Sequence, residues 1–362
     1  YLRCTMDTYE DYLRVVKVFK NIPDPVNASW VDLVQTLSVL EDESGFKLAR
    51  RKKNEFEYSE LTLGTAQLGM EYGIANRNGK PTTEKAISLI HKAIGYGLNS
   101  IDTARGYGDA ESRVGEALKG SYAGKVRVVT KLDPLGWVEP NQSANSISAA
   151  VEASVYRSCR ELGLQKLPVL LLHRWEHRRA HQGAVWERLL QLKAEKVIGV
   201  LGASVQTPEE ALEAIQDLEI KQVQLPFNIL DWRWRKAGVI QALEERKDLI
   251  VHIRSVFLQG ILTTDSNLWP KINGVKAWEL VAEIDELVKT LNRENRADLC
   301  IAYVRSHPWV DSLVIGMETL EQLEENIRLF KNHPLTGEEV AIVESSLNDA
   351  PEKLLNPALW RS

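Results

Sequence analysis

The sequence predicts an α/β protein built on a closed (β/α)8 barrel, the TIM barrel, with an N-terminal helical extension. Eight short apolar runs recur over residues 57–362, and segments with helical periodicity separate them. This alternation predicts a parallel sheet, and the count of eight favours a closed barrel over an open doubly wound sheet. The open sheet is the alternative, but its phosphate fingerprint GxGxxG is absent after the first strand.

The expected strands are apolar runs bounded by turn residues. In chain order they lie near Leu61, Ile101, Val128, Leu170, Val200, Val223, Ile250 and Leu313. The expected helices between them include residues 83–97, 109–120, 144–163, 184–196, 207–218 and 237–247.

Capping signals support this division. Thr207 stands before Pro208 with Glu210 three residues further on, which predicts a capping box with proline in the first helical position. Thr319 and Gln322 have the same spacing and predict a second capping box. Both helices are therefore expected to begin directly after these threonines.

Residues 1–56 do not follow the barrel pattern. TYEDYLRVVKVF and SWVDLVQTLSVL, residues 8–19 and 29–40, have the pattern of two amphipathic helices, and the charged run ARRKKNEFE that follows is typical of a linker. We interpret residues 1–56 as a separate segment and residues 57–362 as the barrel domain. Because the chain begins at Tyr1, we expect its true beginning to be missing from this sequence.

Composition excludes several classes of function. The net charge of −5 comes without a basic stripe, so nucleic acid is not an expected partner. Cys4, Cys159 and Cys300 lie far apart without CxxC spacing, so we expect neither disulfides nor a metal site, and a reducing cytoplasm fits. No apolar stretch approaches the roughly 20 residues of a membrane span.

Four polar side chains follow the ends of expected strands. Asp102 follows LNSI, Lys131 follows VRVVT, His173 follows PVLLL, and Tyr107 lies five residues after Asp102. Reactive groups of such barrels lie at the carboxyl ends of the strands, so we expect these side chains to meet. An acid, a phenol, an amine and an imidazole together can reduce a carbonyl, which needs hydride at carbon and a proton at oxygen.

The expected roles follow from charge. Tyr107 donates the proton, and because a free phenol with a pKa of about 10 is too weak an acid, the Lys131 ammonium is expected to lower its pKa. Asp102 keeps the lysine charged, and His173 bonds to the carbonyl oxygen. Taken singly, Asp102 also fits a turn cap, Tyr107 a surface aromatic, Lys131 a solvated strand end and His173 a core histidine. The functional interpretation rests on their occurring together.

The stretches that carry these residues resemble the aldo-keto reductase family. NSIDTARGYGDAESRVGEAL is similar to the family signature around its aspartate and tyrosine, VVTK to its lysine strand and LLLH to its histidine strand. GTAQLG, VLGASVQTPEEA, QLPFNILD and VIGMETLEQLEENI extend the resemblance over residues 61–347. It implies a nicotinamide dinucleotide across the carboxyl face of the barrel and reversible reduction of an aldehyde or ketone without metal.

The resemblance also implies cofactor-binding positions, among which Ser204 and Gln224 match residues that hold the nicotinamide carboxamide. The full set is Ser204, Gln224, Arg254, Gly316, Met317, Glu318, Thr319, Gln322, Glu325 and Asn326. Arg254 replaces the tyrosine that commonly stacks on the nicotinamide. The family favours NADPH, but Glu318 would repel a 2′-phosphate and would accept from a ribose hydroxyl instead, which leaves NADH open.

Substrate clues are indirect. Tryptophans and arginines gather on loops expected at the active face, and they would suit a sugar or an anionic group: Trp137, Trp175, Trp232, Trp234, Trp269, Arg174, Arg233 and Arg235. They equally fit loops packed on the barrel. RCTMDTYEDYLRVVKVF resembles the closing segment of cytidylyltransferases that activate acidic sugars. The resemblance implies that residues 1–56 include the tail of an upstream nucleotidyltransferase domain, and it favours a sugar or nucleotide-sugar carbonyl. An ordinary helical cap on the barrel is the alternative.

The sequence thus predicts an NAD(P)H-dependent reductase. A non-catalytic dinucleotide-binding redox sensor or docking subunit is the alternative from another class. A barrel that forms a Schiff base on Lys131 is a third reading, and it is disfavoured because a Schiff-base lysine works best uncharged.

Overall fold

The structure is a computed structural model that describes residues 9–22, 24–30, 32–33, 46–53, 55–74, 76, 78–139, 142–347 and 349–360. The chain divides into two compact units, Tyr1–Lys47 and Leu48–Ser362. In the first unit, α1 (Tyr9–Lys20) confirms the first expected helix. Most of the second expected helix, and the start of the segment that resembles cytidylyltransferases, lie outside the described residues.

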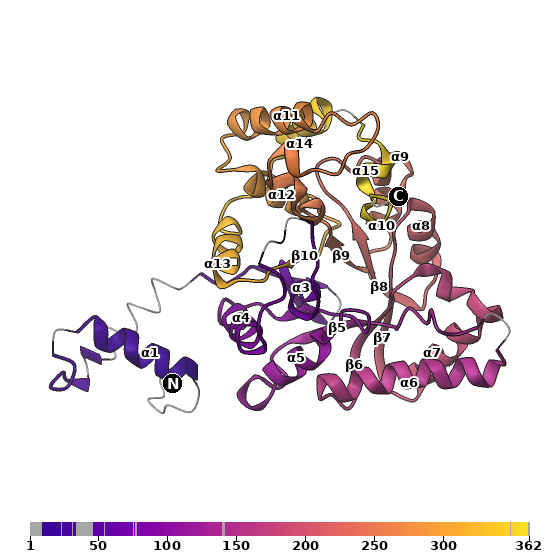
Figure 1. Ribbon diagram of the computed structural model, residues 1–362, viewed down its shortest axis with the longest axis horizontal. Coiled ribbons are helices and arrows are strands. Elements are labelled where there is room, and N and C mark those ends of the chain that lie inside the picture. Colours follow the sequence, from indigo (N-terminus) through magenta and orange to yellow (C-terminus); the bar gives the residue numbers. More distant parts are fainter. Residues whose placement is uncertain are drawn as a thin grey trace. The chain divides into compact units, whose positions relative to one another are not determined.

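The second unit contains a closed barrel of eight parallel strands, which confirms the predicted fold (Figure 1). Each of the eight expected apolar runs forms one of them. Around the barrel the order is β10-β3-β4-β5-β6-β7-β8-β9. The bounds are β3 (Leu61–Gly64), β4 (Ser100–Asp102), β5 (Arg127–Lys131), β6 (Leu167–Leu172), β7 (Ile198–Ser204), β8 (Ile220–Pro226), β9 (Ile250–Arg254) and β10 (Ser312–Gly316).

Helices surround the barrel, as Figure 1 shows for α4 to α8. The α-helices of this unit are α3 (Ala66–Gly69), α4 (Thr83–Gly95), α5 (Ala110–Ala117), α6 (Ala144–Leu162), α7 (Ala184–Ala194), α8 (Pro208–Gln216), α9 (Arg233–Lys236), α10 (Val239–Glu245), α11 (Ala277–Thr290), α12 (Arg296–Arg305), α13 (Leu320–Leu329), α14 (Gly337–Ser346) and α15 (Glu352–Leu355). Short 3-10 helices are η1 (Gly120–Tyr122), η2 (Trp175–Arg178), η3 (Ala180–Gly183), η4 (Leu258–Thr263), η5 (Ser266–Leu268) and η6 (Pro357–Leu359).

The predicted start of α8 is confirmed. Thr207 accepts from the backbone N–H of Glu210, and the Glu210 side chain accepts from the backbone of Thr207, with Pro208 in the first turn. This reciprocal pair satisfies N–H groups that the first turn of a helix leaves without partners. It fixes the path of the chain directly after β7.

Part of the expected linker forms a hairpin. Strands β1 (Arg50–Lys53) and β2 (Phe56–Ser59) pair antiparallel, and Lys53 forms an ion pair of 2.9 Å with Asp311, which precedes β10. These charged residues are therefore paired within the unit Leu48–Ser362. The assignment of residues 1–56 as a separate domain stays a prediction.

The register of the strands gathers polar side chains at one end of the barrel. Gly64 pairs with Asp102, Ser204 with Gln224, and Pro226 with Arg254. All are the last residues of their strands, apart from Gln224, and parallel strands bring their carboxyl ends to the same edge. Of the helices in the described part of the chain, none is both long and apolar enough to span a bilayer.

Candidate active site

The structure brings the four candidate catalytic residues together. Lys131 Nζ lies 2.6 Å from Asp102 Oδ1 and 4.9 Å from the centre of the Tyr107 ring. The rings of Tyr107 and His173 meet edge to face with their centres 5.7 Å apart. The side chains expected to meet from β4, the loop after it, β5 and the end of β6 therefore form one cluster.

Asp102 and Lys131 form a buried ion pair, and each of the two side chains also makes a hydrogen bond to a neighbouring residue. The Lys131 ammonium also donates to the backbone oxygen of Thr103 at 3.1 Å, and Gln224 Nε2 donates to Asp102 Oδ2 at 2.8 Å. Both carboxylate oxygens of Asp102 thus have a partner. Burial acts to lower the pKa of Lys131, but Asp102 and Tyr107 outweigh it and the net shift is upward, so the ammonium stays charged.

Tyr107 is partly buried, and its pKa differs from the expectation. Burial raises the pKa of the phenol above its ordinary value of 10.0, although the Lys131 ammonium acts to lower it as expected. The reason is that desolvation of the phenolate outweighs a single cation that is itself paired with Asp102. At neutral pH the hydroxyl therefore carries its proton.

His173 is neutral in this setting. Burial, followed by the charges of Lys131 and Arg254, lowers the pKa of its imidazole to about 3. Its Nδ1 atom is buried and has no hydrogen-bond partner among the described residues. A neutral imidazole beside Tyr107 can orient an oxygen atom without adding a second positive charge.

The loop that carries Tyr107 is held on two sides. Arg105 forms an ion pair with the fully buried Glu111, whose other oxygen accepts from Thr130 Oγ1 at 2.6 Å. On the other side the backbone of Gly69 in α3 lies against it: a Cβ atom at Gly69 would come within 2.0 Å of Tyr107 O. The position of the phenol is thus fixed by a backbone contact that only glycine allows.

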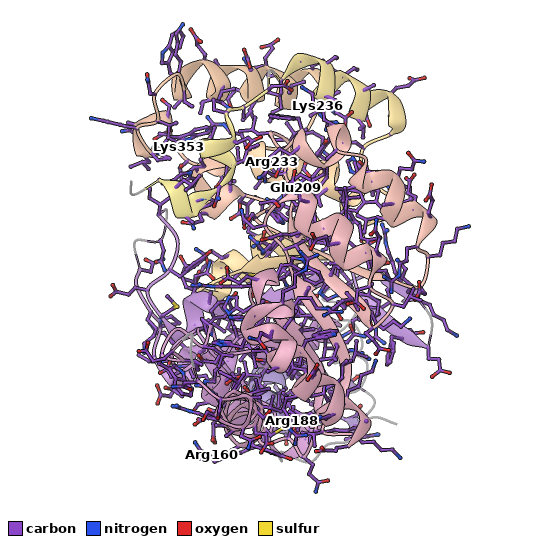
Figure 2. The ribbon with its side chains drawn as sticks, turned by 90° about the vertical axis from the view of Figure 1, so that its right-hand side faces the viewer. Arg160, Arg188, Glu209, Arg233, Lys236 and Lys353 are labelled. Atoms are coloured by element: carbon purple, nitrogen blue, oxygen red, sulfur yellow. The ribbon has the colours of Figure 1, made fainter. Side chains whose placement is uncertain are left out.

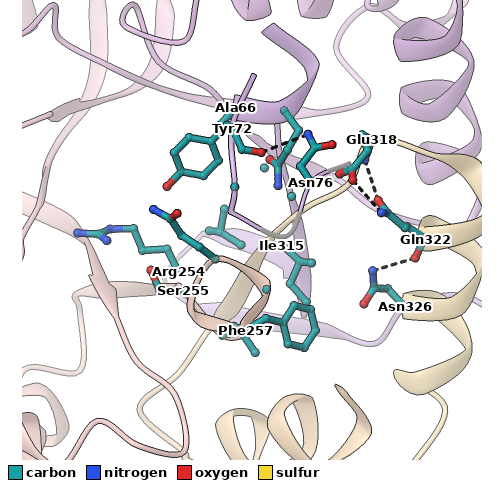
Figure 3. A pocket seen from close by; sticks show the side chains of 18 of the residues that line it. Ala66, Tyr72, Asn76, Arg254, Ser255, Phe257, Ile315, Glu318, Gln322 and Asn326 are labelled. Atoms are coloured by element: carbon teal, nitrogen blue, oxygen red, sulfur yellow. Dashed lines mark hydrogen bonds between the residues drawn. The ribbon is translucent and has the colours of Figure 1, made fainter. Parts of the chain in front are cut away.

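A cavity of about 430 Å³ runs from this cluster to the start of α13 (Figure 3). Asp102, Tyr107 and Gln224 line it at the catalytic end, where Arg254 also lies. The predicted cofactor residues that line the cavity are Gln224, Arg254, Gly316, Glu318, Gln322, Glu325 and Asn326. Ser204, Met317 and Thr319 are not among its lining residues, and the Met317 side chain is fully buried.

The far end of the cavity shows a modified capping arrangement. Thr319 accepts from the backbone N–H of Gln322 at 3.2 Å, as predicted. The Gln322 side chain, however, accepts from the backbone N–H of Glu318 and donates to its carboxylate, both at 2.9 Å, instead of returning to Thr319 (Figure 3). The expected second capping box is therefore only half formed, because the longer reach to Glu318 satisfies both groups of the amide. Glu318 is buried against Gln322 and not solvated.

Part of the lining comes from residues that the sequence pattern does not single out. Tyr72 and Asn76 enter from the segment after β3 and α3, and Ser255, Phe257 and Gln259 enter from the loop after β9 (Figure 3). Loops after barrel strands form the active face, so both segments had a positional signal. Their residue types alone carry none.

The tryptophans and arginines expected at the substrate site do not line this cavity. Arg233 pairs with Asp231 and Arg235 with Glu344, so their charges are already compensated. Figure 2 shows Arg233 and Lys236 on α9, at the opposite end of the view from Arg160 and Arg188. Trp234 and Trp269 are buried, and Trp137 is exposed. The indole of Trp232 donates to Ala350 O, and that of Trp175 donates to Glu213. Arg174 pairs with Glu176. They pack and pair around the barrel.

The residues fit a nicotinamide dinucleotide. Hydrogen-bonding side chains line the cavity at the catalytic end and at α13. Gln206, whose Oε1 accepts from Arg254, has a buried Nε2 donor without a partner among the described residues. Helix N-termini favour phosphate groups, and α13 begins beside Gly316 and Glu318. Within the described part of the chain, no group of three His, Cys, Asp or Glu side chains is placed to hold a metal ion.

Comparison with known proteins gives a consistent family. The sequence pattern of the Aldo/keto reductase family matches residues 60–348. The chain is 22% identical over 320 residues to the L-glyceraldehyde 3-phosphate reductase of Escherichia coli O157:H7, covering 80% of this chain and 91% of that protein. It is 26% identical over 298 residues to the NADH-specific methylglyoxal reductase of Escherichia coli strain K12, covering 74% and 89%.

A solved structure shows the same fold. The holo form of an aldo-keto reductase from Bacillus halodurans superposes with a TM-score of 0.67 at 22% identity, over 84% of this chain and 97% of that chain.

Proposed function

This chain belongs to the aldo/keto reductase family, and we propose that it reduces a carbonyl group with Tyr107 as the proton donor. Membership makes it an oxidoreductase that uses a nicotinamide cofactor. The observation that carries the proposal is the buried Asp102–Lys131 pair beside the Tyr107 ring. His173 completes the proposed catalytic residues.

When bound, the cofactor supplies a hydride to the carbonyl carbon. Tyr107 donates its phenolic proton to the carbonyl oxygen as negative charge develops there. Lys131 stabilises the phenolate that remains, and Asp102 holds the ammonium in place and charged. The neutral His173 imidazole orients the carbonyl oxygen by a hydrogen bond.

The cofactor-binding role of the residues identified from the resemblance is part of the proposal. Gln224 and Ser204 are assigned to the carboxamide end. The remaining positions proposed for the cofactor are Gly316, Met317, Glu318, Thr319, Gln322, Glu325 and Asn326, with Met317 restricted to its backbone because its side chain is buried.

The resemblance favours NADPH, but the charges of the cavity favour NADH. Glu318 and Glu325 line the end formed by α13, and Arg254, at the other end, is the one basic side chain among the lining residues. A 2′-phosphate at α13 would meet negative charge, whereas a ribose hydroxyl would find an acceptor. We therefore propose that NADH is preferred over NADPH.

The named substrates of the relatives are small aldehydes, one of them phosphorylated. A small aldehyde or ketone is accordingly the proposed substrate class, and a sugar carbonyl remains within it. An upstream nucleotidyltransferase domain and a cytoplasmic location stay predictions. The Schiff-base alternative is disfavoured by the upward shift in the pKa of Lys131, since that chemistry needs the free amine.

Replacement of Tyr107 by Phe tests the mechanism. We expect turnover of methylglyoxal and glyceraldehyde to fall by about a thousandfold, within the range for loss of a general acid, while NADH affinity measured by tryptophan fluorescence stays the same. Tyr156→Phe, at a half-exposed position on α6, is the control. Retained turnover in Tyr107→Phe would refute the proton-donor role, and cofactor binding without turnover in the wild type would favour the redox-sensor alternative.

A further inference from the structure

The catalytic end of the cavity contains a cation that no described carboxylate contacts, although Asp102 and Glu210 act on it from a greater distance. Arg254, the last residue of β9, is the one basic side chain among the residues that line the cavity. Its recorded hydrogen bonds both come from Nη2, to Val205 O at 3.0 Å and Gln206 Oε1 at 2.7 Å. Both acceptors are neutral, and none of the carboxylates described lies within 4.0 Å of the guanidinium.

This arrangement differs from that of the neighbouring arginines. Arg105, Arg233 and Arg235 each form an ion pair with a carboxylate. Arg254 is instead anchored through one nitrogen, and its Nη1 and Nε donors make no hydrogen bond within the described part of the chain. A partly buried cation with no carboxylate in contact loses part of its hydration, and a bound anion would offset that cost.

The location of Arg254 indicates which anion this is. Arg254 interacts electrostatically with Tyr107, and its charge contributes to the lowered pKa of His173. Arg254 therefore lies close to the proposed catalytic residues. In Figure 3 Arg254 lies beside Tyr72 and Ser255, at the opposite side of the cavity from Glu318 and Gln322. The start of α13, where the dinucleotide phosphates are assigned, is therefore at the other end.

We propose that Arg254 binds an anionic group, a carboxylate or a phosphate, on the carbonyl substrate itself. The inference rests on the proposed function and names its substrate class: an aldehyde or ketone with a negative charge a few bonds from the carbonyl. The guanidinium keeps its Nε and Nη1 hydrogens as donors to an anionic oxygen, in charge-assisted hydrogen bonds. The bonds from Nη2 to Val205 and Gln206 hold the group in place before substrate arrives. A role of Arg254 towards the cofactor, as the sequence analysis had it, is the competing assignment.

Matched substrate pairs test the inference. Glyceraldehyde 3-phosphate is compared with glyceraldehyde, and 4-oxobutanoate with butanal, for the wild type and for Arg254→Gln and Arg254→Lys. We expect the wild type to prefer the anionic member of at least one pair, and the pair shows whether the group is a phosphate or a carboxylate. In Arg254→Gln the KM of that member should rise by about tenfold or more while the neutral member changes little. Arg254→Lys, which keeps the charge but loses the planar group anchored by Val205 and Gln206, should fall between.

Three further readouts separate the assignments. NADH affinity, followed by tryptophan fluorescence, should be the same in all variants, and weaker NADH binding in Arg254→Gln with an unchanged substrate preference would overturn the inference. Loss of the preference in Arg174→Gln, the exposed arginine next to His173, instead of in Arg254→Gln would also overturn it. If no aldehyde is reduced, the proposed function fails, but the role of Arg254 can still be tested by binding. Calorimetric titration of the NADH complex then compares glycerol 3-phosphate with glycerol, and 4-hydroxybutanoate with butan-1-ol. Equal binding within both pairs would count against it.

Discussion

The Nζ atom of Lys131 lies 2.6 Å from the Oδ1 atom of Asp102, and the two form a buried ion pair. Only 1% of the Lys131 side chain and 4% of the Asp102 side chain are exposed. Such a pair is expensive to break from one side, because the remaining partner keeps its charge in a place that water does not reach. Gln224 bonds to the second oxygen of Asp102, so the carboxylate cannot turn to another cation. The pair is a structural feature of the barrel as well as part of the proposed chemistry.

Lys131→Met is therefore expected to lower stability as well as activity. The uncompensated Asp102 carboxylate should reduce the free energy of unfolding by about 3–5 kcal/mol, measured by urea denaturation at pH 7. The double variant Asp102→Asn with Lys131→Met removes both charges, so its loss should be clearly smaller than the sum of the two single losses. Additive losses would show that the two groups do not stabilise each other.

Much of the barrel could be predicted from the sequence because each strand is a separate apolar run with helical periodicity on either side. Asp102, Lys131 and His173 were found because parallel strands bring their ends to one edge, so position along the chain implies proximity in space. The same reasoning does not reach Tyr72 or Asn76, because they lie in a segment whose path depends on how α3 packs.

Other features depend on side-chain reach and burial, which the sequence does not show. Gln322 bonds to Glu318 instead of returning to Thr319, and this choice follows from the turn before α13. The net pKa shift of Tyr107 depends on how deeply the ring is buried. The charged run ARRKKNEFE predicts a linker because it shows no apolar alternation, yet strands β1 and β2 form a hairpin there, and the ion pair of Lys53 with Asp311 holds it.

Gly69→Ala is expected to displace Tyr107 without contacting any ligand. The added methyl group would lie 2.0 Å from Tyr107 O and 2.5 Å from the backbone nitrogen of Ala110, so the backbone on one side must move. A misplaced proton donor should lower kcat by about tenfold to a hundredfold. Steady-state kinetics with methylglyoxal measures the change.

Gly136→Ala is the matched control, since nothing lies within 4 Å of a Cβ atom at Gly136 in the loop after β5. Its kcat should equal that of the wild type. If Gly69→Ala is equally active, the contact between α3 and the Tyr107 loop does not set the position of the phenol.

Glu318→Gln is expected to change cofactor preference. Its carboxylate is buried at the α13 end of the cavity and bonded to Gln322, and an amide keeps the shape while removing the charge. The wild type should bind NADH more tightly than NADPH, and in the variant NADPH affinity should rise by about fivefold or more, since like charges at close range cost on the order of 1 kcal/mol. Parallel fluorescence titrations with both cofactors measure the ratio.

Glu338→Gln, an exposed position in the first turn of α14, serves as the control and should leave the ratio unchanged. A wild type that binds NADPH at least as tightly as NADH would contradict the proposed preference and return to the NADPH expected from the family resemblance.

The burial of His252 predicts how the free energy of unfolding depends on pH. It lies fully buried in the barrel on β9, its Nδ1 is 3.3 Å from Gln222 Nε2, and its ring meets Tyr58 edge to face. Burial, with smaller contributions from Arg127 and Lys131, lowers the pKa of His252 from 6.5 to about 3. As pH falls below 6.5 the unfolded chain binds a proton at this position, and the folded chain does so only near pH 3.

Stability should therefore decrease across this range by about 1.4 kcal/mol per pH unit for this one group. In His252→Asn that contribution disappears, so the free energy of unfolding, measured in urea between pH 6 and pH 4.5, should decrease with a slope smaller by this amount. The absolute stability of the variant also reflects altered packing, which is why the slope is the quantity compared. His333→Gln controls for loss of an exposed imidazole. An unchanged slope in His252→Asn would mean that the buried imidazole takes up its proton at the same pH in the folded and the unfolded chain.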